Sequence, residues 1–154
     1  MRRAGFTIIE LLVVLSISAI GLTFAALAFT GYFERVAAEN AAQVFARDLT
    51  LARSWAVRSR EPVVIRFYES SRWYEVQTQS TATEVATRRF GVSADIDLSG
   101  VTLDMPGDSL VFDARGIADL SGAGGPLGTA TFSSGGVMYT VSFNSMGASK
   151  IDRT

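Results

Sequence analysis

The most pronounced pattern in the sequence is an apolar run near the N-terminus. Residues 6–33 carry a single charged side chain, that of Glu10. As an α-helix this run would be about 42 Å long, against roughly 30 Å for the hydrocarbon core of a bilayer. A secretory signal peptide has a shorter apolar region followed by small residues at its cleavage site, and residues 32–35 offer no such site. The run therefore predicts a membrane-spanning helix.

Two basic residues, Arg2 and Arg3, precede the apolar run. Positively charged residues beside a span favour the cytoplasmic side of the membrane. We therefore expect a single pass through the membrane, with the N-terminus in the cytoplasm and everything after Phe33 outside.

The helix is predicted to continue beyond the membrane. No Pro occurs between Glu34 and Arg60, and Glu61-Pro62 is expected to end the helix, because Pro disfavours a helical residue before it. The whole helix would be on the order of 80 Å long. At about 100° per residue its outer half has a broad apolar stripe. The stripe consists of Phe33, Ala37, Ala41, Val44, Phe45, Leu51, Ala52, Trp55 and Ala56.

Two residues of this stripe have predicted roles inside the fold. Trp55 is expected to lie in the core. Asp48 falls among apolar neighbours, so we expect its carboxylate to hydrogen-bond the sheet or to pair with an Arg, because a buried charge needs a partner. No second acid shares that face, which argues against a functional acidic site.

After Pro62 the pattern changes to the two-residue period of β-strands. The segment from Glu69 to Arg72 reads as the turn of the first hairpin, and the glycine-rich segment 122–128 reads as a loop without the Lys-Ser/Thr of a phosphate-binding loop. The predicted fold class is α+β, with one long helix packed on an antiparallel sheet. Predicted strands are 63–67, 73–77, 88–90, 101–103, 110–112, 129–132, 138–143 and 149–151.

Composition narrows the possible functions. The 154 residues suit one small domain with an appendage, and 14 basic against 15 acidic residues give no global attraction to nucleic acid. The chain contains no His and no Cys, which excludes disulfides, the usual catalytic triads and most zinc sites. We therefore expect neither an enzyme nor a bound cofactor. The acidic residues Asp95, Asp97, Asp104 and Asp108 lack the spacing of a calcium-binding loop and are expected to be solvated.

The N-terminal run Gly5-Phe6-Thr7-Ile8-Ile9-Glu10-Leu11-Leu12-Val13-Val14 resembles the signal of type IV pilins and type II secretion pseudopilins. That resemblance implies that a prepilin peptidase cuts after Gly5 and that the new N-terminal residue, Phe6, is N-methylated. It divides the chain into a leader (1–5), a transmembrane and filament-core half-helix (6–33) and an exported head (34–154). The head is expected to fold alone as a soluble domain.

Glu10 has a physical reason to contact a neighbouring subunit. An ionised carboxylate inside a bilayer costs about 2.5 kcal/mol or more. Cleavage creates a possible partner, the new ammonium group of Phe6, either in the same chain or in another one. The resemblance implies that the ammonium of a neighbouring subunit is the partner and that Glu10 sets the axial register of a filament. An ordinary membrane anchor with a protonated Glu is the alternative.

A second resemblance concerns the head. Four segments of the chain resemble the GspH/FimT group of minor pilins. They are residues 45–56, the strand region 60–67, the run Val111-Phe112-Asp113-Ala114-Arg115-Gly116 and residues 142–151. The resemblance implies a structural subunit of a type II secretion pseudopilus or a type IV pilus, with other pilin-like subunits as partners. Many pilins have a Pro in the apolar helix, whereas this chain has Gly21 and Gly31.

The alternative function is that of a DNA-binding minor pilin. DNA-binding members of the group have a C-terminal Gly-Arg-x-Arg run, and the matching place here is Gly147-Ala148-Ser149-Lys150, without either arginine. Lys150 and Arg153 remain as possible weak contacts, with Asp152 between them. Because the head carries 12 basic and 14 acidic residues, its overall field does not favour DNA. We expect weak binding or none.

Overall fold

The computed structural model describes residues 7–91, 96–97, 102–104, 108–121 and 126–154. It divides into two compact units, Met1–Phe33 and Glu34–Thr154. Several residues named in the sequence predictions lie outside the described ranges, namely Arg2, Arg3, Gly5, Phe6, Asp95, Val101 and Gly122 to Gly125.

One long helix, α1, extends from Ile8 to Ser59. Thr7 caps its start, because the Thr7 hydroxyl oxygen accepts a 3.3 Å hydrogen bond from the backbone N–H of Glu10. Its end also follows from the sequence. Arg60 has a φ of 56°, the left-handed conformation that closes many helices, and Pro62 then prevents continuation. The predicted end of the helix is confirmed.

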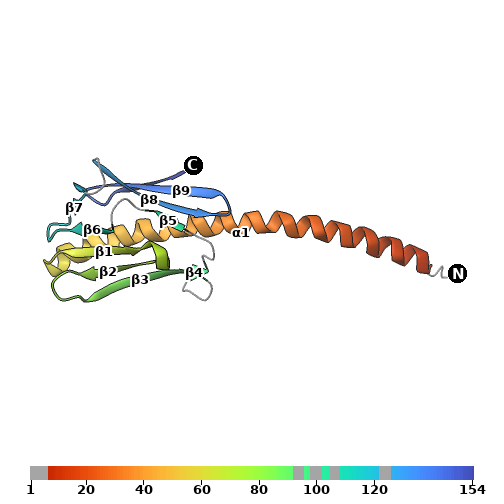
Figure 1. The fold of residues 1–154 in the computed structure, drawn as a ribbon, viewed down its shortest axis with the longest axis horizontal. Helices are drawn as coiled ribbons and strands as arrows, with labels where there is room; N and C mark the ends of the chain where they lie inside the picture. The colour runs from red at the N-terminus through yellow and green to blue at the C-terminus, as the bar shows by residue number, and fades with distance from the viewer. Residues whose placement is uncertain (1–6, 92–95, 98–101, 105–107, 122–125) are drawn as a thin grey trace, which may run out of the picture. The chain divides into compact units, whose positions relative to one another are not determined.

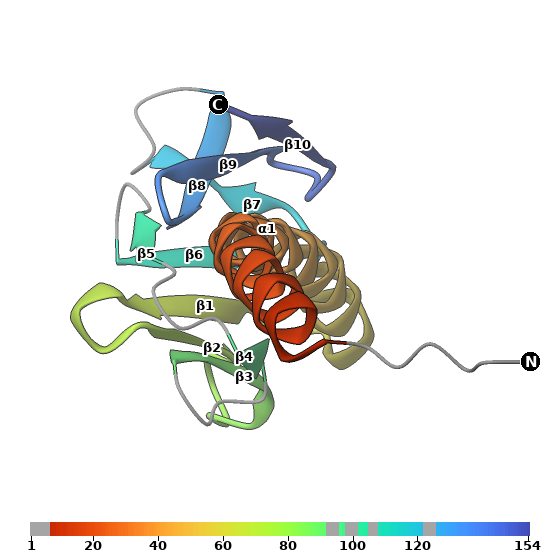
Figure 2. The ribbon, with the colours of Figure 1, turned by 90° about the vertical axis from the view of Figure 1, so that its right-hand side faces the viewer.

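The head (unit Glu34–Thr154) contains two sheets (Figures 1 and 2). The six-stranded sheet has the order β4-β3-β2-β1-β6-β7 and consists of β1 (Val63–Tyr68), β2 (Trp73–Thr78), β3 (Glu84–Gly91), β4 (Ile96–Asp97), β6 (Ser109–Phe112) and β7 (Ala118–Asp119). The four-stranded sheet has the order β10-β9-β8-β5 and consists of β5 (Thr102–Asp104), β8 (Leu127–Ser134), β9 (Val137–Asn144) and β10 (Ser149–Arg153). A short 3₁₀ helix, η1 (Glu69–Ser71), joins β1 to β2.

The α+β class with an antiparallel head is confirmed, with two differences in detail. The strands are shared between two sheets, and the short pair of β3 with β4 is parallel. Two of the strands, β4 and β7, are only two residues long, and a pattern with a period of two cannot be recognised over so short a stretch.

The core of the head forms where the outer part of α1 lies between the two sheets (Figure 1). Phe45 is fully buried at its centre. Its ring lies 5.6–6.0 Å from the rings of Phe67 and Tyr74 in the six-stranded sheet and of Phe132 and Phe143 in the four-stranded sheet. Most of the other buried helix residues are alanines, which lets both sheets approach the helix. The buried apolar residues of α1 are Ala38, Ala41, Ala42, Phe45, Leu49, Ala52 and Ala56.

The predicted stripe overlaps the buried face at Ala41, Phe45, Ala52 and Ala56, whereas Trp55, predicted to lie in the core, packs against the core without being fully buried. Trp55 is half-buried at the margin of the core, and the Arg58 guanidinium lies 5.4 Å from its ring centre. At about 100° per residue, Trp55 lies roughly 80° around the helix from Phe45. Leu49, which the predicted stripe omitted, is fully buried.

Candidate functional site

The first unit presents an apolar surface that nothing in the described structure covers. The segment Ile8–Ala25 has a mean hydropathy of 2.3, and none of it is buried. Two hydroxyl groups of this segment bond within the helix, because Ser16 and Thr23 donate to the carbonyl oxygens of Leu12 and Ala19 at 2.8 and 3.0 Å. Such internal bonds suit an apolar environment, since an unpaired hydroxyl would cost free energy there.

Glu10 is the acidic side chain of this apolar segment. It is exposed, and among the described residues no hydrogen bond or ion pair reaches its carboxylate. The two other residues of the predicted processing site, Gly5 and Phe6, lie outside the described ranges. The candidate assembly site therefore has an apolar helix face and one carboxylate without a partner in the described part of the chain.

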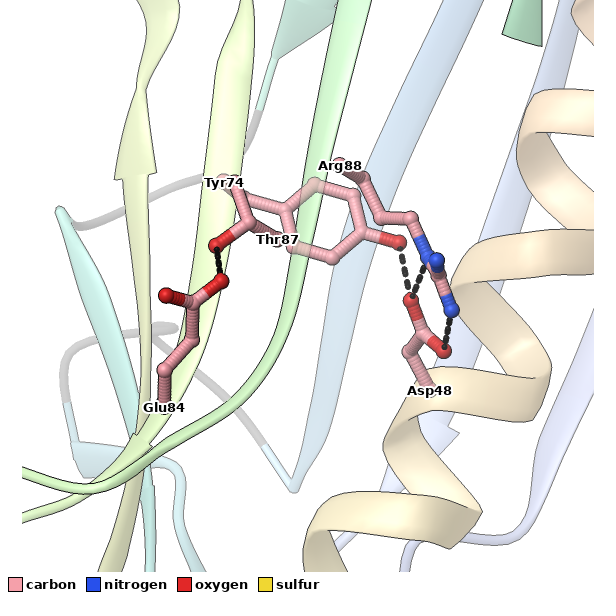
Figure 3. Close-up of polar contacts among 5 residues, drawn as sticks. All are labelled: Asp48, Tyr74, Glu84, Thr87 and Arg88. Atoms are coloured by element: carbon pink, nitrogen blue, oxygen red, sulfur yellow. Dashed lines mark hydrogen bonds and ion pairs between the residues drawn. The ribbon is translucent and has the colours of Figure 1, made fainter. Parts of the chain in front are cut away.

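A buried ionic cluster in the described part of the head joins α1 to the six-stranded sheet (Figure 3). Asp48 on α1 accepts a 2.8 Å hydrogen bond from the Tyr74 hydroxyl of β2. Arg88 of β3 donates to both carboxylate oxygens of Asp48, through Nε at 2.8 Å and Nη2 at 3.1 Å. The Asp48 side chain is 4% exposed and that of Arg88 32%. The expectation that Asp48 bonds the sheet or pairs with an Arg is confirmed in both parts.

The electrostatics of this cluster match a structural role. Burial, followed by the nearby Asp48 charge, raises the pKa of Tyr74 well above its ordinary value, so the phenol stays protonated and donates. The hydrogen bond to Asp48 raises the pKa of Arg88. The Tyr74 hydroxyl and the Nε and Nη2 groups of Arg88 thus all donate to Asp48. The cluster holds helix and sheet together.

The two C-terminal cations do not form a strong basic patch. Lys150 Nζ lies 2.6 Å from Asp152 Oδ1, so its charge is offset locally, while Arg153 is exposed. Arg88 and Arg89, two adjacent basic residues on β3, are engaged in other contacts. Arg88 binds Asp48, and the Arg89 guanidinium lies 5.8 Å from the Trp73 ring centre.

No metal-binding arrangement appears in the part of the chain that the structure describes. Within it, no group of three or more acidic side chains is positioned to hold an ion. Asp95, one of the four acidic residues noted in the sequence, lies outside that part.

Sequence inspection missed a pair of similar turns. Asp113 Oδ1 accepts hydrogen bonds from the N–H groups of Arg115 and Ile117, and Asn144 Oδ1 accepts from Met146 and Ala148 in the same pattern. Each turn has a glycine with positive φ, Gly116 at 77° and Gly147 at 71°. The shared pattern, Phe-Asp/Asn-x-x-Gly, is readable at residues 112–116 and 143–147.

Together, an exposed apolar N-terminal helix and an α+β head built around the rest of that helix define a pilin-like filament subunit. The chain belongs to the family of the type II transport protein GspH, whose model matches residues 41–147. Residues 1–26 also match the prokaryotic N-terminal methylation motif. No curated protein matches the sequence at a significant level.

Solved structures of two proteins are similar in fold. The type IV minor pilin FimU of Pseudomonas aeruginosa has 16% identity and a TM-score of 0.56, over 80% of this chain and 92% of that one. The minor pseudopilin EpsH from the type 2 secretion system of Vibrio cholerae has 15% identity and a TM-score of 0.51, over 76% of this chain and 95% of that one.

The family assignment confirms the predicted class of function. The chain is a minor pilin or pseudopilin subunit, a structural component rather than an enzyme. Membership of the family implies a membrane anchor and association with other subunits of this type.

Proposed function

We propose that the chain is a single-pass protein of a bacterial inner membrane that enters a filament through its N-terminal helix. The uncovered apolar segment Ile8–Ala25, interrupted by the carboxylate of Glu10, carries this proposal. Residues 1–5 are the leader, 6–33 the span and filament core, and 34–154 the exported head. The N-terminus is cytoplasmic, since Arg2 and Arg3 precede the span. In the filament Glu10 pairs with the ammonium group of Phe6 from a neighbouring subunit.

Processing is expected between Gly5 and Phe6. The cut removes Arg2 and Arg3 and leaves 149 residues with a net charge of −3. Intact mass spectrometry of the protein from membranes should give a chain that starts at Phe6 and carries one methyl group. A Gly5→Leu variant, in which the residue before the cut is bulky, should keep Met1. A wild-type chain that keeps Met1 in a host with an active prepilin peptidase would contradict the proposal.

The filament is proposed to be a type II secretion pseudopilus or a type IV pilus. The family description names type II transport, and the fold is shared with a type IV minor pilin and with a secretion pseudopilin. Deleting the gene and measuring both protein secretion and pilus assembly separates the two, since each machine produces only one of these outputs.

The head is expected to bind duplex DNA weakly or not at all at physiological salt. Each phosphate contact needs a free cation, and at the C-terminus Lys150 is paired with Asp152, which leaves Arg153. An anisotropy titration of the head with a duplex measures this directly. Low-micromolar binding that weakens steeply with salt, and that is lost in a Lys150→Ala, Arg153→Ala double variant, would instead assign the protein to DNA uptake.

A further inference from the structure

The end of the head at which α1 stops carries an uncovered apolar surface. Five large apolar side chains are exposed in the described part of the head. Three of them belong to the last turns of α1 or to the two similar turns: Val57 (50% exposed), Ile117 (41%) and Met146 (53%). Figure 1 shows these segments at the same end of the head, opposite the end at which the chain enters it. We call this the distal surface.

Contacts around two glycines hold the distal surface together. A Cβ on Gly116 would lie 2.8 Å from Val57 Cγ2 and 3.0 Å from Arg53 Cγ, and one on Gly147 would lie 3.6 Å from Arg53 Cδ. The backbone N–H of Ala118 donates to the carbonyl oxygen of Ser145 at 2.7 Å, which ties the two turns side by side. The methylene groups of Arg53 therefore pack against both turns.

The guanidinium group of Arg53 is the chemically distinctive part of this surface. Its stem is fixed by packing, yet among the described residues no carboxylate or other acceptor binds its N–H groups. A guanidinium presents several donors in a planar fork that fits a carboxylate. Because the stem is already ordered, a carboxylate binds it with a smaller loss of side-chain entropy.

The charges near Arg53 are of both signs. Arg58 and Arg60 are exposed at the end of α1. Asp113 pairs with Arg115 at 2.8 Å, Glu61 accepts a hydrogen bond from Thr81 at 3.1 Å, and Asp119 accepts one from the N–H of Ser121 at 2.9 Å. Because none of these acids bonds Arg53, a carboxylate from a partner complements its guanidinium.

We propose that the distal surface is the docking site for the head of another pilin-like subunit. That subunit would place a carboxylate on Arg53 and an apolar side chain against Val57, Ile117 and Met146. The inference rests on the assignment of the chain as a filament subunit and specifies which surface of its head receives a neighbour. Exposed apolar groups around a preordered cation are typical of interface centres, where Arg is enriched.

The test uses the full-length chain in host cells that contain its filament system. A photo-crosslinking amino acid is placed at Met146 or, as the matched control, at Met138. Met138 is 44% exposed on β9, and its carbonyl oxygen accepts a hydrogen bond from the backbone N–H of Thr154. Thr154 follows β10 and Met146 precedes it, so the two probe positions lie at opposite ends of that strand. Incorporation of the chain into filaments is measured in the same cells. We expect the Met146 probe to yield a product with a second protein that carries a prepilin-type N-terminus, at about ten times the yield of the Met138 probe.

Charge variants identify the role of Arg53. Arg53→Glu and Arg53→Met, the second of which retains an apolar stem, should each lower the crosslink yield about tenfold, which corresponds to roughly 1.4 kcal/mol. Arg53→Lys should retain part of it. The control Arg47→Glu changes an exposed arginine two turns earlier on the helix and should leave the yield unchanged.

Three results would overturn the inference. The first is an equal crosslink yield from the Met146 and Met138 probes in chains that do enter filaments. The second is a crosslinked product with a protein that has no prepilin-type N-terminus. The third is full crosslink yield from both Arg53→Glu and Arg53→Met. A chain that never enters filaments and gives no product would contradict the filament assignment as well, so the two failures are distinguishable.

Discussion

A Glu10→Ala chain is expected to insert into the membrane and fold its head normally but to be depleted from filaments by about tenfold or more. Removing the only charge from an apolar span makes insertion slightly more favourable. The loss is expected in assembly alone, where the proposed pair of this carboxylate with the ammonium of a neighbour would be desolvated and worth roughly 2 kcal/mol or more. The measurement compares the amount of the chain in sheared filaments with the amount in membranes.

Two variants of the same helix provide controls for Glu10. Glu10→Gln preserves the size and removes the charge, so it should behave like the alanine variant if charge pairing matters. Ser16→Ala removes a hydroxyl that donates only to Leu12 of its own helix, so assembly should be unchanged. Wild-type incorporation of both Glu10 variants would show that Glu10 makes no register contact.

Asp48→Ala is expected to destabilise the isolated head by about 3 kcal/mol. The substitution leaves the Tyr74 hydroxyl and the Arg88 guanidinium without their acceptor, and removing one partner of a buried ion pair costs roughly 3–5 kcal/mol. The lower end applies here because the Arg88 side chain is about a third exposed and water can reach it. Urea unfolding of residues 34–154 should show a lower midpoint with an unchanged slope.

The substitution Tyr74→Phe, which removes a single hydroxyl group, separates the two contacts of Asp48. It removes one hydrogen bond and leaves the pair of Asp48 with Arg88 intact, so the expected cost is about 1 kcal/mol. A cost for Asp48→Ala no larger than that for Tyr74→Phe would show that the ion pair contributes nothing to the free energy of unfolding.

The helix and its functional motif were predictable because both depend on local sequence. An apolar run of bilayer length, a Pro after the last turn and the Gly5 to Glu10 spacing are all visible along the chain. The main strands were equally visible from their two-residue period. The contacts between helix and sheet were predicted less completely. The sequence indicated that Asp48 needs a partner, but not that Tyr74 and Arg88 are its partners.

The misses have a common physical cause. Sheets on two sides of α1 determine which of its residues are covered, so small residues such as Ala38 and Ala42 are buried, whereas Trp55 lies at the margin. Hydrophobicity alone favours the large indole for the core. The distal surface was missed for the same reason, because Arg53 and the two turns meet only after long-range packing.

The strand β10 has a consequence for the protein before it is assembled. It is the outermost strand on one side of its sheet in the described fold, and an open strand edge invites pairing with other chains. Its exposed residues include Lys150, Asp152 and Arg153. A foreign strand that paired there would have to accommodate these charges, so the same C-terminal residues that offer little to DNA disfavour edge-to-edge pairing between unassembled subunits.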